Sequence, residues 1–106
     1  MELKQKHCIP CEAGTPPLTP AMVAKLLKKL PGGWKQVENK QIRKEFKFKS
    51  YPQTIAFVIR AALIAQEEGH HPDLEVHYSK VVVTLSTHAI NGLSDNDFIL
   101  AAKIDN

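Results

Sequence analysis

Histidine is the residue type in this chain best suited to acid/base chemistry, because its ordinary pKa lies between pH 5 and 8. His70 and His71 are adjacent and precede Pro72, and His88 follows at the end of a predicted strand. Side chains at element ends gather at the rim of a sheet, where sites are usually built. Imidazoles in one pocket could catalyse an elimination or a hydration, one donating a proton to a leaving hydroxyl while another accepts one. Each histidine taken singly is better explained as a surface or helix-end residue, so the hypothesis depends on the group.

A zinc site is a second interpretation of these histidines, taken together with Cys8 and Cys11. Imidazole nitrogen and thiolate sulfur are the usual ligands of zinc. However, adjacent histidines seldom bind one ion together, and the Cys-x-x-Cys spacing occurs only once. We therefore favour two reduced, buried thiols or a redox-inert loop, and we expect no metal. Glycine-rich phosphate loops and nucleophile-elbow serines are absent from the sequence.

Two polar residues near the histidines have a plain structural role as well as a possible functional one. Asp97 lies three residues after Ser94, which is the spacing of a capping box at a helix N-terminus. Gln66 lies four residues before His70, on the same face of a helix if the helix extends that far. A solvated helix surface is the plain interpretation of Gln66.

Apolar periodicity and capping residues predict three helices. The first begins at Pro20 after Thr19, a good N-cap, and ends at Pro31. The second and longest spans 51–68, with Gly69 just past its end. The third spans 94–104. The buried face of the longest helix is predicted to comprise Ile55, Val58, Ile59, Ala62 and Leu63.

Four strands are predicted, at 34–38, 41–49, 73–78 and 80–87. Turns at Asn39-Lys40 and Ser79-Lys80 would close two hairpins. Apolar and charged residues alternate along 41–49, which is typical of an antiparallel sheet with one face in water. The order helix-strand-strand-helix-strand-strand-helix predicts an α+β fold, a four-stranded antiparallel sheet with three helices packed on one face.

Length and composition favour one globular domain over residues 1–106, in which 1–18 form an irregular lead. Apolar residues make up 43% and charged residues 24%, so disorder is not expected. No apolar run is long enough to span a membrane, and none follows the first lysines, so we expect a soluble, cytoplasmic protein.

The charge distribution raises the question of nucleic-acid binding, because residues 1–53 contain 11 Lys/Arg and only 4 Asp/Glu. Those charges alternate with core positions and no nucleic-acid-binding motif accompanies them, so a solvated face is favoured.

Several separated motifs together resemble the pterin-4a-carbinolamine dehydratase family. The resemblance is carried by the sequence from Gly69 to Asp73, by Tyr78, by the sequence from Leu85 to His88, and by Gly92-Leu93-Ser94-x-x-Asp97. Five residues separate Pro72 from Tyr78, nine separate Tyr78 from His88, and eight separate His88 from Asp97. A spacing with this many parts is far more specific than an isolated histidine pair. The predicted order of elements and the segments Gly33-Trp34 and 46–48 also fit, and the Cys8-x-x-Cys11 lead resembles that of some bacterial and plant members.

The resemblance implies dehydration of a 4a-hydroxytetrahydropterin to the quinonoid dihydropterin, with no metal or organic cofactor. The substrate would come from a pterin-dependent aromatic amino acid hydroxylase, and a reductase could regenerate the tetrahydropterin. By similarity, His70 and His88 would be the acid/base pair and His71 would mainly hold the pterin. The residues implied to bind or support the substrate are Asp97, at the rim of the site, with Gln66, Trp34, Ser86 and Thr87. A homotetramer or homodimer is implied as well.

The sequence departs from the family at Gln66, where members often carry glutamate or another ionisable residue. Glutamine can form a hydrogen bond but cannot titrate, so a neighbouring histidine is expected to be less basic. Glu67 on an adjacent helical face is a candidate substitute. This departure bears on the rate and the pH optimum more than on the type of reaction.

A binding or assembly protein of the same fold is the alternative function. The family also contains dimerisation cofactors of transcription factors and chaperone-like assembly factors, the latter with eroded sites. Retention of all three histidines favours the enzyme. A zinc-binding module ranks below both, and direct nucleic-acid or membrane binding is not expected.

Overall fold

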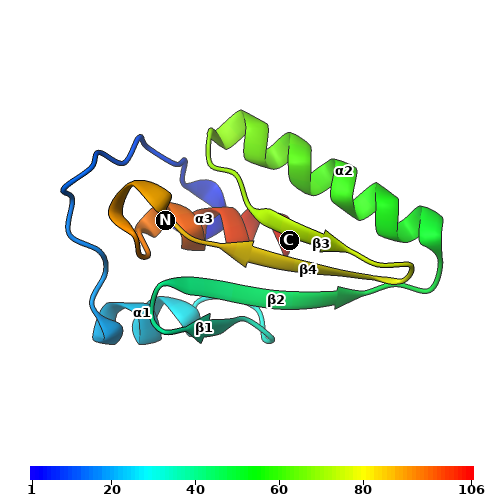
Figure 1. Cartoon of the computed structure of the whole chain (residues 1–106), viewed down its shortest axis with the longest axis horizontal. Helices are drawn as coiled ribbons and strands as arrows, with labels where there is room; N and C mark the ends of the chain where they lie inside the picture. The colour runs from blue at the N-terminus through cyan, green and yellow to red at the C-terminus, as the bar shows by residue number, and fades with distance from the viewer.

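The computed structural model describes residues 1–106 and has the predicted α+β architecture (Figure 1). The elements in chain order are η1 (Leu3–Gln5), α1 (Pro20–Leu27), β1 (Lys35–Val37), β2 (Gln41–Lys47), α2 (Tyr51–Glu68), β3 (Asp73–Val76), β4 (Lys80–Leu85), η2 (His88–Ile90) and α3 (Asp95–Ile104). The two η elements are short 3-10 helices. Three helices and four strands follow one another in the order that the sequence predicted. Helix α2 has the predicted ends, and α3 begins one residue later than predicted, because Ser94 is its N-cap.

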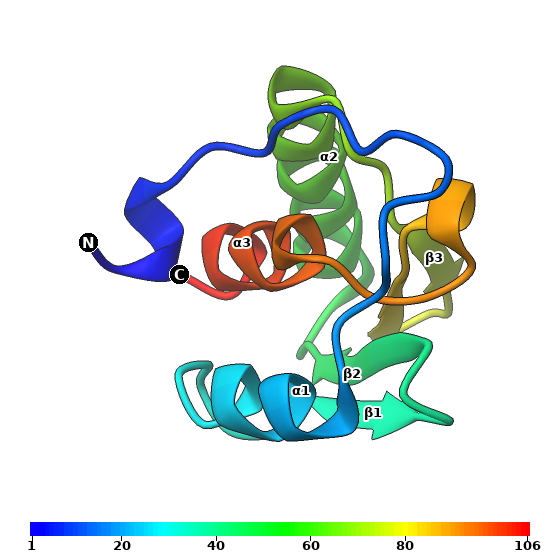
Figure 2. The same ribbon diagram turned by 90° about the vertical axis from the view of Figure 1, so that its left-hand side faces the viewer.

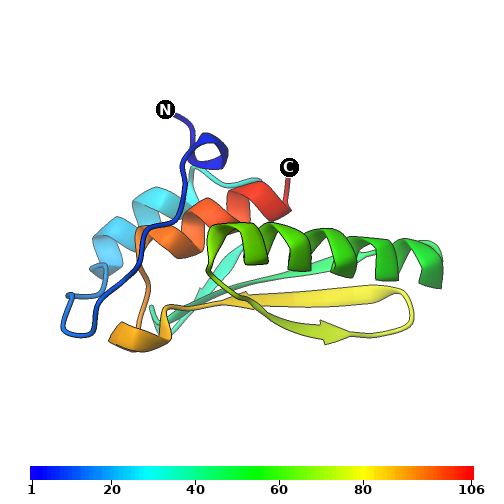
Figure 3. The ribbon, with the colours of Figure 1, turned by 90° about the horizontal axis from the view of Figure 1, so that it is seen from above.

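The four strands form one antiparallel sheet in the order β1-β2-β4-β3. The two hairpins therefore meet along β2 and β4, where Ile42 pairs with Leu85 and Phe46 with Val81. The helices all lie on one side of this sheet (Figure 3). Its other face carries charged side chains such as Arg43, Glu45 and Lys47, all exposed, as the alternation predicted.

The core lies between the sheet and α3. Seen from the end, α3 runs between α1 and α2 (Figure 2). Helix α3 is therefore buried almost all round: Phe98, Leu100 and Ala101 are fully buried. They pack in the same cluster as Val83 and Leu85 of the central strand β4. Since α3 also begins beside the histidines, the core fixes the position of its first turn.

The exposed face of α2 corrects the prediction for that helix. Thr54, Ala61 and Ala65 are the buried residues, whereas Ile59 and Leu63 are 55% and 67% exposed. Small side chains on the buried face let α2 approach the rest of the fold closely. The apolar stripe of α2 is wider than this contact, so periodicity alone could not identify which part of it faces inward.

Helix α1 and strand β2 end earlier than predicted, because hydrogen bonds within the chain change its direction there. Helix α1 ends at Leu27, and the next residues form 3-10-type hydrogen bonds up to Leu30. The helix does not continue because Pro31 disfavours the helical conformation of the residue before it. Strand β2 ends at Lys47, since the Lys49 N–H already donates to Gln53 of α2.

Strands β3 and β4 end at Val76 and Leu85, two residues earlier than predicted. The first hairpin turn centres on Glu38-Asn39, which both have positive φ, and the second on Tyr78-Ser79. Each turn is thus one residue before its predicted place. No helix of the molecule is long and apolar enough to cross a membrane.

Candidate active site

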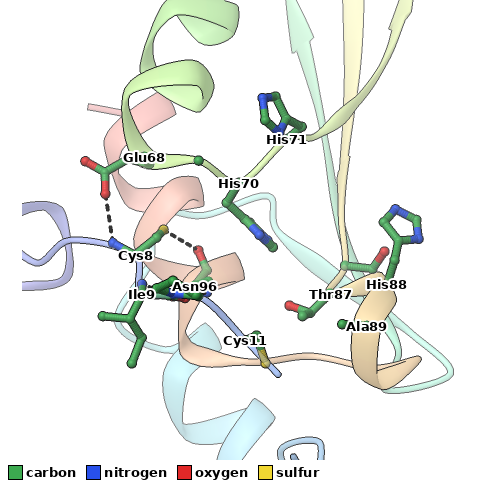
Figure 4. A pocket seen from close by; sticks show the side chains of 13 residues that line it. Cys8, Ile9, Cys11, Glu68, His70, His71, Thr87, His88, Ala89 and Asn96 are labelled. Carbon is green, nitrogen blue, oxygen red and sulfur yellow. Dashed lines mark hydrogen bonds between the residues drawn. The ribbon is translucent and has the colours of Figure 1, made fainter. Parts of the chain in front are cut away.

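A cavity of about 390 Å³ opens where α2, β4 and α3 bring their ends together with the N-terminal segment (Figure 4). The segment after α2 contributes His70 and His71, and the segment after β4 contributes Ser86, Thr87 and His88. The structure therefore brings all three predicted histidines, and both residues that precede His88, to one cavity.

His70 is held by a buried carboxylate. Its Nε2 lies 2.6 Å from Asp97 Oδ1, and its side chain is 13% exposed. Asp97 is fully buried, and its other oxygen accepts hydrogen bonds from the Thr87 hydroxyl at 2.8 Å and the Ser94 N–H at 3.0 Å. Asp97 thus lies beneath the histidine rather than at the rim, where it was expected. An ionised carboxylate only accepts hydrogen bonds. With Asp97 in that form, Nε2 of His70 is the donor of this bond and Nδ1 is the nitrogen that can accept a proton.

The capping-box prediction for Ser94 and Asp97 is confirmed by the Ser94 N–H bond to the carboxylate. The same side chain therefore caps α3 and orients His70. It can do both because its two oxygens accept in different directions. The local spacing predicted the first role, and only the fold shows the second.

His71 is exposed and lies beside Gln66, with 3.1 Å between its Nε2 and Gln66 Oε1. The sequence placed Gln66 on the face of His70 only if the helix extended as far as His70. Gly69 instead ends α2 in the left-handed conformation, with a φ of 68°, and redirects the chain before the histidines. Gln66 therefore orients the second histidine, and Asp97 orients the first.

His88 lies across the cavity from His70 (Figure 4). It opens η2 rather than ending β4, and its side chain is exposed. The loop closes when the Thr87 N–H donates to the Gly92 carbonyl at 2.8 Å. A Cβ on Gly92 would come within 2.7 Å of Pro17, so glycine is needed where the N-terminal segment crosses this loop.

Asp97, Gln66 and Trp34 are predicted site residues that do not line the cavity. Asp97 and Gln66 contact histidines that do, whereas Trp34 is hydrogen-bonded elsewhere. Its indole is buried, and its Nε1–H donates to Asp105 Oδ2 at 2.8 Å. Lys44 Nζ lies 2.6 Å from the same oxygen. The Trp34 hydrogen bond therefore connects the start of β1 to the end of α3.

The sequence did not reveal that the N-terminal segment forms part of the cavity. Cys8, Ile9, Pro10 and Cys11 line it, together with Glu68 and Asn96. Both cysteines are free. Burial, with the negative charges of Glu68 and Asp97, raises the pKa of Cys8 to about 12. The Cys8 thiol is therefore protonated at neutral pH, where it is a poor nucleophile.

Glu68 connects the N-terminal segment to the end of α2. Its carboxylate accepts from the Cys8 N–H at 2.8 Å, lies 3.0 Å from His7 Nδ1 and lies 3.4 Å from Lys103 Nζ. Burial alone would raise the pKa of Glu68. The hydrogen bonds from Cys8 and His7 and the charge of Lys103 outweigh burial and hold that pKa below its ordinary value. No group of three or more His, Cys, Asp and Glu side chains is placed to hold a metal ion.

The arrangement defines a class of protein with a histidine-lined pocket at one edge of an antiparallel sheet covered by helices. Two imidazoles face the same cavity from different elements, and a buried carboxylate orients one of them. Comparison with known sequences gives the family. Residues 16–106 match the model of pterin 4 alpha carbinolamine dehydratase, and the chain belongs to this family.

Relatives extend the match along nearly the whole chain. A protein of Nitrosospira multiformis named "Putative pterin-4-alpha-carbinolamine dehydratase" is 52% identical over 104 residues, covering 98% of this chain and 90% of the relative. A protein of the same name from Nitrosomonas eutropha is 48% identical over 104 residues, covering 98% of this chain and 91% of the relative.

Two solved structures share the fold. A transcriptional coactivator/pterin dehydratase from Brucella melitensis superposes with a TM-score of 0.78 and 36% identity, covering 83% of this chain and 94% of that one. A pterin dehydratase-like protein described as a RuBisCO assembly factor in the alpha-carboxysome gives a TM-score of 0.60 and 31% identity, covering 69% of this chain and 86% of that one.

Proposed function

We propose that this protein dehydrates a 4a-hydroxytetrahydropterin to the quinonoid dihydropterin and water, as part of tetrahydropterin recycling. The observation that carries the proposal is the common cavity of His70, His71 and His88, with His70 fixed on the buried Asp97. Membership of the dehydratase family supports the same reaction.

The elimination needs one group that gives a proton and one that takes a proton. The bond from C4a to the hydroxyl oxygen breaks, and the hydroxyl leaves as water with a proton from the acid. The base removes a proton from a ring N–H, and the electron pair of that bond forms the new double bond. His70 and His88 face the cavity from opposite sides, which suits them to act on two ends of one small ring system.

His71 and the polar side chains near it are assigned to binding. Ser86 and Thr87 line the cavity, and Gln66 orients His71. Gln66 gives His71 a neutral hydrogen-bond partner that cannot itself take part in proton transfer. The acid/base assignment therefore falls on His70 and His88. A positioned acid or base contributes about 10²–10⁴-fold, which suits a dehydration that already proceeds slowly in water.

The physiological setting follows from the reaction. A pterin-dependent aromatic amino acid hydroxylase would supply the substrate, and a reductase would consume the product. We place the enzyme in the cytoplasm, as a single domain that assembles into a homodimer or homotetramer. No metal or organic cofactor takes part in the proposed reaction.

A non-catalytic role as an assembly or transcriptional cofactor is the second candidate. It is favoured by the descriptions of the two solved structures, one a coactivator and the other a RuBisCO assembly factor. The presence of three histidines around one cavity favours the enzyme over this role.

The decisive experiment generates the 4a-hydroxytetrahydropterin in situ with a hydroxylase and follows its decay by absorbance. We expect wild-type protein to accelerate the decay. His70→Ala and His88→Ala should each lower kcat by about 10²-fold or more. His77→Ala is the matched control, because His77 is exposed and does not line the cavity. Decay at the buffer rate with wild-type protein would overturn the proposal and favour the non-catalytic role.

A further inference from the structure

The segment His7–Cys11, called here the N-terminal strap, crosses the cavity although it precedes residues 16–106 of the family match. It has no regular secondary structure, yet it is held at both sides. On one side, the Cys8 N–H donates to Glu68 Oε1 at the end of α2. On the other side, the strap is bound to the first turn of α3.

Asn96 makes that second attachment with both ends of its amide. Its Oδ1 accepts from the Ile9 N–H at 3.1 Å, and its Nδ2 donates to the Ile9 carbonyl at 2.6 Å. The Cys8 thiol also donates to the Asn96 carbonyl, with Sγ 3.6 Å away. Asn96 is only 5% exposed, so these bonds are shielded from water. The Asn96 amide thus bonds to both the N–H and the carbonyl of Ile9, the same two backbone groups that a neighbouring β-strand would bond to.

The anchor of the strap and the anchor of His70 are adjacent residues. Asn96 holds Ile9, and Asp97 holds the His70 ring. The first turn of α3 therefore fixes the strap and the histidine relative to each other. Residues 8–11 form part of the cavity wall, so a ligand that reaches His70 lies next to them. In Figure 4, Cys11 lies between Asn96 on one side and Thr87 on the other.

We propose that the N-terminal strap is a wall of the substrate site that limits the size of the pterin it accepts, with Cys11 as a specificity-determining residue and Asn96 as the residue that positions the strap. This inference rests on the proposed function of the same cavity. The strap carries none of the assigned acid/base groups. Changes to it should therefore act on pterin binding more than on the chemical step, which raises KM and leaves kcat nearly constant.

The first test enlarges the side chain at the cavity wall. Cys11→Phe should raise KM for the 4a-hydroxytetrahydropterin by about tenfold, with kcat within about twofold of wild type. Ala13→Phe is the matched control, since Ala13 is exposed, lies two residues further on and does not line the cavity. A KM for Cys11→Phe equal to that of Ala13→Phe would overturn the inference.

The second test measures the strap directly by alkylation with iodoacetamide, read out by mass spectrometry. In wild-type protein, 7,8-dihydrobiopterin should slow the alkylation of Cys11 by about fivefold or more if the bound pterin covers the thiol. Asn96→Asp places a carboxylate oxygen against the Ile9 carbonyl and should release the strap. It should therefore speed the alkylation of Cys8 and raise KM more than it lowers kcat.

Ile9→Pro gives an independent variant, because it removes the Ile9 N–H that donates to Asn96 Oδ1, the other hydrogen bond of the pair, and leaves the sequence of α3 unchanged. It should reproduce both effects of Asn96→Asp. A pterin that binds to wild-type protein without protecting Cys11 would overturn the inference and leave the proposed function standing. Wild-type protein that neither binds nor dehydrates a pterin would overturn the proposed function itself, and the inference with it.

Discussion

The His70 side chain illustrates how one buried carboxylate can set the properties of a site. Asp97 has no solvent contact, and all of its hydrogen bonds are made to His70, Thr87 and Ser94. Each partner belongs to a different segment: the end of α2, the end of β4 and the start of α3. The carboxylate therefore joins these three segments and orients the ring that we assign to acid/base chemistry.

Replacing this carboxylate should affect both activity and stability. Asp97→Asn removes the charge that favours Nε2 protonation and places an amide where three donors converge. We expect kcat to fall by about tenfold or more and the free energy of unfolding to fall by about 1–3 kcal/mol. Steady-state kinetics and urea denaturation measure the two effects. Asp95→Asn, on the exposed neighbouring carboxylate, should change neither, and an equal loss in that variant would contradict the assignment.

Glu68 predicts a pH dependence of stability. Its pKa is held low in the folded protein, so its ionised form stabilises the fold. That stabilisation is complete above the ordinary glutamate pKa of about 4.3 and is lost as the pH falls through the lower folded value. Glu68→Gln should thus be less stable than wild type near neutrality, and urea denaturation should show the difference in stability shrinking as the pH falls below the ordinary glutamate pKa. The control is Glu67→Gln, because Glu67 is exposed, and its stability relative to wild type should not change with pH in this way. A stability difference between Glu68→Gln and wild type that grew on acidification would refute the prediction.

Residue types and spacing identified the histidines, because local patterns placed each at the end of an element. They could not identify Cys8 or Asn96 as parts of the same cavity. Asn96 bonds to a residue 87 positions away, and no periodicity records which distant segment will lie against a helix start. The sequence also could not show that Trp34 bonds to Asp105 rather than lining the cavity, because Asp105 lies 71 positions away.

At the scale of elements, the end of α2 decides where the histidines point. Gly69 closes the helix with a left-handed residue, and His70 and His71 follow at once. Their partners then lie on different elements, Asp97 on α3 and Gln66 on α2 itself. The sequence predicted the end of this helix correctly. It did not predict the partners, because the direction of the chain after a left-handed residue depends on the tertiary fold.

A pair of glycine substitutions tests this turn. Gly69 has a φ of 68°, whereas Gly32 is not among the glycines with positive φ, and an added Cβ would meet no atom within 4 Å at either position. Gly69→Ala should therefore cost about 1 kcal/mol through backbone strain alone and also reduce activity by displacing the histidines. Gly32→Ala should be neutral or stabilising. Thermal denaturation compares the two, and equal stability would show that the turn tolerates a side chain.

At the scale of the whole molecule, the exposed face of α2 is the largest departure from the predicted packing. Ile59 and Leu63 lie one turn apart on this face and present apolar side chains to solvent. Exposed apolar patches of this kind mark surfaces that associate. The homodimer or homotetramer that we propose would cover them, which gives a reason for an apolar stripe wider than the intramolecular contact requires.

Self-association through α2 can be tested with one charge. In a two-fold symmetric contact the same patch meets its own copy, so a single substitution places two like charges in one interface. Leu63→Glu should therefore lower the molar mass measured by light scattering after size-exclusion chromatography, while circular dichroism stays unchanged. Lys25→Glu, on the exposed face of α1, is the control that changes charge without touching the stripe. A wild-type molar mass equal to that of one chain would mean that α2 does not meet a second copy, and it would direct attention to a different partner for this face, as an assembly role requires.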